Sequence, residues 1–139
     1  MELFSKLKEM KILLIDDDEW IRDSLSLFLE SEGCHLLALE TAEEGMEALK
    51  RQHFDIIIAD YKLPIMDGLE FFRKIQKYNS QVIKILITAY GSEELFLEAK
   101  GIGIADIIEK PFTTEVIEAS LSRLIIAHEI EKKQFRVIH

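Results

Sequence analysis

The sequence predicts an α/β fold in which helices cover both faces of a five-stranded parallel sheet. Five short apolar runs alternate with amphipathic stretches along the 139 residues, and this alternation is typical of parallel strands joined by helices. The third run, residues 55–59, is apolar after its first residue, as expected of a strand covered on both faces. Because such crossovers are right-handed, they build a three-layer sandwich.

The first strand and helix lie near the amino-terminal end. Residues 11–15 form an apolar run that ends at three aspartates. Residues 19–32 follow with apolar side chains at helical spacing, namely Ile21, Leu25, Phe28 and Leu29. Gly33 comes next, at the position where a helix commonly ends in a left-handed conformation. We therefore expect the first helix to end there.

The next part of the chain repeats the alternation with clear local signals. The run at residues 35–39 is weaker than the others, which favours a place near the edge of the sheet. Thr41 then opens a helix with Glu44 three residues later, the spacing of a capping box. The strand at 55–59 leads into a turn that contains Leu63-Pro64 and Asp67-Gly68.

The carboxyl-terminal half completes the pattern. We expect a helix at 69–78, a strand at 82–87, a helix at 92–100, a strand at 105–108 and a last helix that begins near Thr113 or Thr114, which are good helix caps. The expected organisation is an N-terminal extension (1–9), one domain (10–127), and a helical extension or the start of a linker (128–139).

Composition and charge exclude several classes of protein. The chain has 48% hydrophobic and 31% charged residues, a globular balance, and its net charge of −9 argues against direct nucleic-acid binding. The single cysteine, Cys34, excludes an internal disulfide and fits a reducing compartment. No apolar run is long enough for a signal peptide or a membrane span. We expect a cytoplasmic protein without membrane contacts.

Polar residues end four of the predicted strands. They are Asp16 to Asp18, Asp60, Thr88 and Lys110. The carboxyl ends of parallel strands meet at one edge of an open sheet, and ligands bind there. Because carboxylates at short range disfavour joint ionisation, Asp16, Asp17 and Asp60 together favour a divalent cation. Asp18 is better explained as a helix cap, since acids are favourable at helix N-termini.

The motifs at these strand ends resemble those of response-regulator receiver domains of two-component phosphorelay systems. The matching segments are Leu14-Ile15-Asp16-Asp17-Asp18, Asp60 with Leu63-Pro64 and Met66-Asp67-Gly68, Ile87-Thr88-Ala89, and Lys110-Pro111-Phe112. Their order and spacing match the family over residues 10–127. The resemblance implies a flavodoxin-like receiver fold with strand order 2-1-3-4-5 and Asp60 as the phosphoacceptor.

The resemblance also implies roles for the surrounding residues. Asp16, Asp17, Asp60 and the main-chain carbonyl of Lys62 would hold Mg²⁺, which prefers hard oxygen ligands. Lys110 would pair with the transferred phosphoryl oxygens, and Thr88 would donate its hydroxyl to the phosphorylated aspartate. The Lys110-Pro111 peptide would be cis.

Partners and output follow from the same resemblance. A sensor histidine kinase or a phosphotransfer protein would phosphorylate Asp60, and the added charge would switch a surface that a downstream protein effector contacts. The family also includes phosphorylation-linked dimers. Ile107 departs from the family pattern, which usually has an aromatic residue three positions before the lysine. This difference argues against a tyrosine-type rotamer switch.

Two other functions fit part of the pattern. Asp16 and Asp18 have the Asp-x-Asp spacing of phosphatases of the haloacid-dehalogenase group, but Glu19-Trp20 stand where those enzymes usually have a glycine and a small β-branched residue. A receiver fold that serves only as an interaction module, without cycling phosphate, is the other alternative. The full set of site residues argues against it. The leading hypothesis is a phosphoaccepting signalling domain rather than an enzyme.

Overall fold

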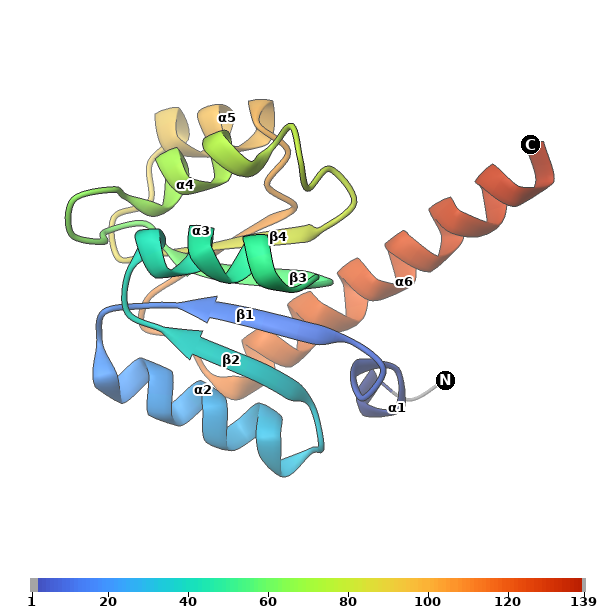
Figure 1. Cartoon of the computed structure of the whole chain (residues 1–139), viewed down its shortest axis with the longest axis horizontal. Helices are drawn as coiled ribbons and strands as arrows, with labels where there is room; N and C mark the ends of the chain where they lie inside the picture. Colours follow the sequence, from blue (N-terminus) through green and yellow to red (C-terminus); the bar gives the residue numbers. More distant parts are fainter. Residues whose placement is uncertain (1–2, 139) are drawn as a thin grey trace.

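A computed structural model describes residues 3–138 and shows a five-stranded parallel sheet between two layers of helices (Figure 1). The strands lie in the order β2-β1-β3-β4-β5, so the predicted fold class and strand order are confirmed. The strands are β1 (Lys11–Ile15), β2 (His35–Leu39), β3 (Ile56–Asp60), β4 (Ile83–Thr88) and β5 (Asp106–Glu109). Residues 1, 2 and 139, at the tips of the two predicted extensions, lie outside the described residues.

Three helices cover each face of the sheet. The helices are α1 (Leu3–Leu7), α2 (Glu19–Ser31), α3 (Ala42–Arg51), α4 (Gly68–Ile75), α5 (Glu93–Gly101) and α6 (Thr114–Ile138). Helices α3, α4 and α5 cover one face, and α1, α2 and α6 cover the other (Figure 1). No helix within the described residues is long and apolar enough to cross a membrane.

Local signals in the sequence begin and end several of these helices. The Asp18 side chain caps α2 by accepting from the main-chain N–H of Trp20 at 2.9 Å. Thr41 and Glu44 form the predicted capping box at the start of α3. Gly33 follows α2 with a φ of 83°, a left-handed conformation that glycine adopts without steric cost.

Some element boundaries differ from the predicted ones by one to three residues. Strands β3, β4 and β5 each begin and end one residue later than expected, which makes Asp60 and Thr88 the last residues of their strands. Helix α4 ends at Ile75, three residues earlier than expected, and a turn follows in which the Ile75 carbonyl accepts from the main-chain N–H groups of Tyr78 and Asn79.

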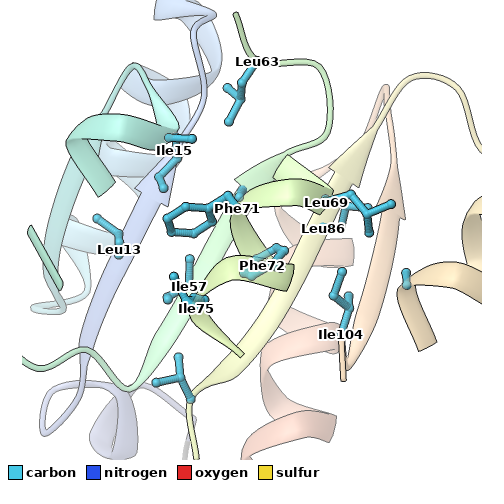
Figure 2. Packing of buried hydrophobic residues seen from close by; sticks show 14 of the residues in the cluster. Leu13, Ile15, Ile57, Leu63, Leu69, Phe71, Phe72, Ile75, Leu86 and Ile104 are labelled. Atoms are coloured by element: carbon cyan, nitrogen blue, oxygen red, sulfur yellow. The ribbon is translucent and has the colours of Figure 1, made fainter. Parts of the chain in front are cut away.

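The hydrophobic core forms two clusters, one on each face of the sheet. Figure 2 shows Phe71 of α4 pointing toward Leu13 and Ile15 of β1, with Phe72 farther from β1. All four side chains are fully buried. Successive strand residues point to opposite faces, so Ile12 and Leu14 pack instead toward α2 and α6, in the second cluster. Burying one such side chain contributes about 1.5–3 kcal/mol. The doubly buried sheet therefore provides a rigid base for the residues at its edge.

Helix α1 contacts α6 on one face of the sheet. Leu7 of α1 is fully buried in the second cluster, and Lys6 Nζ lies 3.2 Å from Glu129 Oε1 of α6. Helix α6 continues through residue 127 without a break, and its far half projects beyond the sheet (Figure 1). The division into domain and extensions stays a prediction.

A polar contact joins β5 to α6. The Asp106 carboxylate accepts hydrogen bonds from Ser120 Oγ at 2.6 Å and from an Arg123 guanidinium nitrogen at 2.8 Å. Its other oxygen accepts from the main-chain N–H of Ile107 at 2.9 Å. Asp106 thereby fixes the start of β5 to the second and third turns of α6.

Candidate functional site

The predicted site residues meet at the carboxyl-terminal edge of the sheet. Asp16 and Asp17 directly follow β1, Asp60 ends β3, Thr88 ends β4 and Lys110 directly follows β5. Carboxylate oxygens of Asp16, Asp17 and Asp60 all lie within 4.8 Å of one another. The parallel register produces this cluster, because it aligns neighbouring strands so that they end at the same edge.

Lys110 contacts two of the three carboxylates. Its Nζ lies 3.2 Å from Asp60 Oδ2 and 3.4 Å from Asp16 Oδ2. The Asp16 and Asp60 side chains are almost completely buried, and Lys110 retains about a fifth of its side-chain exposure. Three carboxylates and one ammonium leave two negative charges in a small volume. One divalent cation would neutralise them.

Burial and mutual repulsion shift the protonation of the cluster. Burial is the largest cause that raises the pKa of Asp60 to about 6, and the charge of Asp16 raises it further, while Lys110 lowers it. Burial likewise raises the pKa of Asp16, against the hydrogen bond from Asp18 and the charge of Lys110. For Lys110, burial lowers the pKa, but the two carboxylates outweigh it and raise the pKa overall. The cluster therefore holds its charges at an electrostatic cost.

Asp16 carries a buried oxygen that lacks a hydrogen bond. Its Oδ1 accepts from the main-chain N–H of Asp18 at 2.9 Å. Its Oδ2 forms the 3.4 Å ion pair with Lys110 but receives no hydrogen bond from any residue that the structure describes. Buried polar atoms are almost always satisfied, and an exception often marks an ion site. An oxygen without a hydrogen bond, two further carboxylates and the excess negative charge fit a hard divalent cation.

Thr88 ends β4, and Lys62 lies in the loop after β3. Thr88 is fully buried, and its Oγ1 accepts from the main-chain N–H of Tyr90 at 2.9 Å. The side chain of Lys62 extends over the Tyr90 ring, with 5.3 Å between Nζ and the ring centroid. This contact connects the loop after β3 to the loop after β4. The ligand role of the Lys62 carbonyl stays a prediction.

The loop after β3 is tightly constrained. The main-chain N–H of Met66 bonds to the Pro64 carbonyl at 2.8 Å, and Ile65 between them has a φ of 69°. This is a γ-turn of the rare, strained kind, and its β-branched side chain is 96% exposed. A Cβ at Gly68 would collide with the main-chain oxygen of Asp60. Only glycine fits at that position without moving Asp60.

An apolar cavity of about 450 Å³ opens beside Lys110. Its lining includes Trp20 and Ile21 of α2 together with Ala89, Pro111 and Phe112 of the two loops near the cluster. Trp20 lines this cavity although its side chain is 78% exposed. The Lys110-Pro111 peptide that borders this cavity is cis, as the resemblance implied.

Arg22 belongs to the site region but was not predicted from the sequence. Its guanidinium donates to the main-chain oxygen of Asp16 at 2.8 Å and to Glu40 Oε1 at 3.4 Å. The only sequence signal is a basic residue one turn into the helix that follows the acidic run. That signal is weak, because surface arginines are common in helices.

The family of the protein follows from comparison with known sequences. A family model for the response regulator receiver domain matches residues 12–122. The chain therefore belongs to the receiver domains of two-component response regulators. The haloacid-dehalogenase alternative is not favoured.

Individual relatives agree with this assignment. The chain is 31% identical over 114 residues to the transcriptional regulatory protein FixJ of Bradyrhizobium diazoefficiens, covering 82% of this chain and 56% of FixJ. A receiver domain structure from Methanospirillum hungatei superposes with a TM-score of 0.83 at 31% identity, covering 88% of this chain and 98% of that one. The beryllofluoride-activated NtrC4 receiver domain dimer superposes with a TM-score of 0.79 at 30% identity. The match covers 85% of this chain and 98% of the NtrC4 chain. The chain thus spans about half the length of FixJ.

Proposed function

We propose that the protein accepts a phosphoryl group on Asp60 from a phosphohistidine of a sensor histidine kinase or phosphotransfer protein. The observation that carries this proposal is the Asp60 carboxylate, held beside Lys110 at 3.2 Å within a cluster of acids. An Asp60 oxygen attacks phosphorus, the bond between phosphorus and the histidine nitrogen breaks, and that nitrogen keeps the bonding electron pair. The aspartyl phosphate forms without an oxidant or a further co-reactant.

The charges of the cluster support this reaction. With a pKa of about 6, Asp60 is mostly ionised near neutral pH and available as a nucleophile. We assign Asp16, Asp17, Asp60 and the Lys62 carbonyl as the groups that hold Mg²⁺. When bound, this ion supplies positive charge that offsets the repulsion between the carboxylates and the incoming phosphoryl oxygens.

Lys110 and Thr88 serve the phosphoryl group in this proposal. The Lys110 ammonium already lies against Asp60 and can turn one of its donors to a phosphoryl oxygen. The Thr88 hydroxyl has an oxygen that accepts from Tyr90, so its own proton is available for donation. Movement of Thr88 toward the phosphoryl group would shift the loop that leads into α5.

The output of the domain is a change in its protein-contact surface. Phosphorylation adds negative charge and strong acceptor oxygens to a buried cluster and thereby biases the loops around it. We propose a downstream protein effector and a dimer linked to phosphorylation, because the related NtrC4 receiver forms a beryllofluoride-activated dimer. Ile107 is only half-buried and aliphatic, so this change proceeds without an aromatic rotamer switch. We further propose a cytoplasmic location and no enzymatic turnover of other substrates.

A phosphorylation assay tests this function. The protein is incubated with Mg²⁺ and a small phosphodonor such as acetyl phosphate, and its intact mass is measured. We expect a gain of one phosphoryl group in the wild type and in Asp55→Asn, which changes an aspartate just before the opposite end of β3. Asp60→Asn should show no gain. Absence of the gain in the wild type, or its persistence in Asp60→Asn, would refute the acceptor role and leave only an interaction module.

A further inference from the structure

Arg22 lies behind the acidic cluster rather than in it. Its side chain is 16% exposed, although it belongs to a surface helix, because the guanidinium turns back to the sheet edge. One nitrogen donates to the Asp16 carbonyl at 2.8 Å, and another donates to Glu40 Oε1 at 3.4 Å. Glu40 follows β2 directly. A single side chain therefore connects α2 to the ends of two adjacent strands.

The contact with Arg22 is one of two hydrogen bonds that hold the Asp16 main chain in place. The Asp16 N–H donates to the Leu39 carbonyl at 3.0 Å, so β2 holds one side of this residue and Arg22 holds the other. Beyond it, the Asp18 N–H bonds to the Asp16 carboxylate and Asp18 caps α2. The short acidic segment is thus anchored at both ends, with Asp17 exposed between the anchors.

The contribution of Arg22 is geometric. The groups that shift the pKa of Asp16 are burial, the N–H of Asp18, Lys110 and Asp17, and Arg22 is not one of them. Arg22 donates its hydrogen bond to the main-chain oxygen of Asp16 and not to the Asp16 carboxylate. A planar guanidinium presents several donors at fixed angles, so it bonds two acceptors at once. A lysine ammonium is a point donor on a flexible stem and fixes two acceptors less well.

We propose that Arg22 is a positioning residue that holds Asp16 and Asp17 in the orientation needed to bind the divalent cation. This inference rests on the proposed Mg²⁺ site. Carboxylates that repel one another spread apart unless the main chain that carries them is held. Loss of a group that orients metal ligands typically weakens metal affinity about 10- to 100-fold.

The test compares Mg²⁺ affinity in variants of the full chain. Trp20 is the only tryptophan and lies two residues beyond the capping Asp18, so its fluorescence follows a titration with MgCl₂. We expect Arg22→Met to bind Mg²⁺ about ten-fold more weakly than the wild type. The matched control is Arg73→Met, which removes the same charge and a 2.7 Å ion pair with Glu98 between α4 and α5. Arg73→Met should keep the wild-type affinity.

Two further variants separate positioning from general stability. Arg22→Lys retains one donor for the Asp16 carbonyl, so its Mg²⁺ affinity should lie between those of the wild type and Arg22→Met. Glu40→Gln keeps the bond from Arg22 to Asp16 and should lose little affinity. The Mg²⁺-dependent rise in melting temperature provides a second measurement that does not depend on fluorescence. If Arg22→Met does not fold, the Mg²⁺ affinities of Arg22→Lys and Glu40→Gln are compared with that of the wild type instead.

The outcomes distinguish this inference from the proposed function. If the wild type does not bind Mg²⁺, or if Asp17→Asn binds as well as the wild type, the proposed metal site fails. If the wild type binds and Asp17→Asn does not, but the Arg22 variants keep full affinity, only the positioning role is overturned. Equal losses in the Arg22 and Arg73 variants would overturn it as well, because the effect would then be one of charge.

Discussion

Replacement of Asp60 by asparagine should make the folded protein more stable near neutral pH. The pKa of Asp60 in the folded state is about 6, compared with 3.8 for an ordinary aspartate. Because the folded pKa is the higher one, the folded state favours the protonated carboxyl. The wild type therefore loses stability as pH rises from below 3.8 through about 6. Asparagine is neutral at every pH and avoids this loss.

The size of the effect follows from the shift in pKa. A difference of about two pKa units at about 1.4 kcal/mol each corresponds to roughly 3 kcal/mol of unfolding free energy above pH 6. We expect Asp60→Asn to exceed the wild type by this order of magnitude at about pH 7 and to match it at about pH 3.5. Lys110 beside Asp60 retains some solvent exposure, so solvent screening makes roughly 3 kcal/mol an upper value.

Urea unfolding at several pH values, with EDTA present, measures this difference. Added Mg²⁺ should narrow the gap at neutral pH by stabilising the wild type, because a cation that binds only the folded state raises its stability. A stability difference that stays constant between acidic and neutral pH would show that the charge of Asp60 is not its source. A wild type more stable than Asp60→Asn at neutral pH without Mg²⁺ would refute the electrostatic argument altogether.

Three further substitutions test individual parts of the site. Ile65→Gly should stabilise the protein by about 1 kcal/mol in urea unfolding, since it relieves a β-branched residue with φ of 69°; unchanged or lower stability would mean that the turn is not strained. Gly68→Ala should cost about 2 kcal/mol or more, because its Cβ collides with the Asp60 carbonyl, and a cost near zero would contradict the close approach. Lys110→Met removes the cation 3.2 Å from Asp60, so the pKa of Asp60, followed by carboxyl NMR, should rise above about 6. A lower pKa in that variant would show that Lys110 does not favour the ionised carboxylate.

Much of the fold and the candidate site could be predicted because the signals are local. An apolar run that ends in aspartate, as at Asp60, gives both the strand and the position of its last side chain. The capping box of Thr41 and Glu44 is likewise complete within four residues. Once the strands are known to be parallel, their carboxyl ends must lie at the same edge of the sheet, so the site residues that follow them are predicted to lie close together.

The remaining features depend on contacts between distant segments or on unfavourable local geometry. The bond from Arg22 to Asp16 depends on how α2 folds back on the sheet edge, which residue spacing does not show. Leu7 is buried only because α1 packs beside α6 on the same face of the sheet. Ile65 contradicts its own propensity, since a β-branched residue rarely adopts positive φ. A local pattern cannot predict a conformation that local energetics disfavour.

The length of helix α6 can amplify small movements that begin near its first turns. Asp106 fixes β5 to its second and third turns through Ser120 and Arg123, and β5 leads directly to Lys110. The part of the helix beyond that anchor, residues 124–138, is about 22 Å long at 1.5 Å per residue. A tilt of about 5° at the anchor would displace its tip by about 2 Å. A small adjustment beside the acidic cluster would therefore be amplified along the helix if it reached the Asp106 anchor.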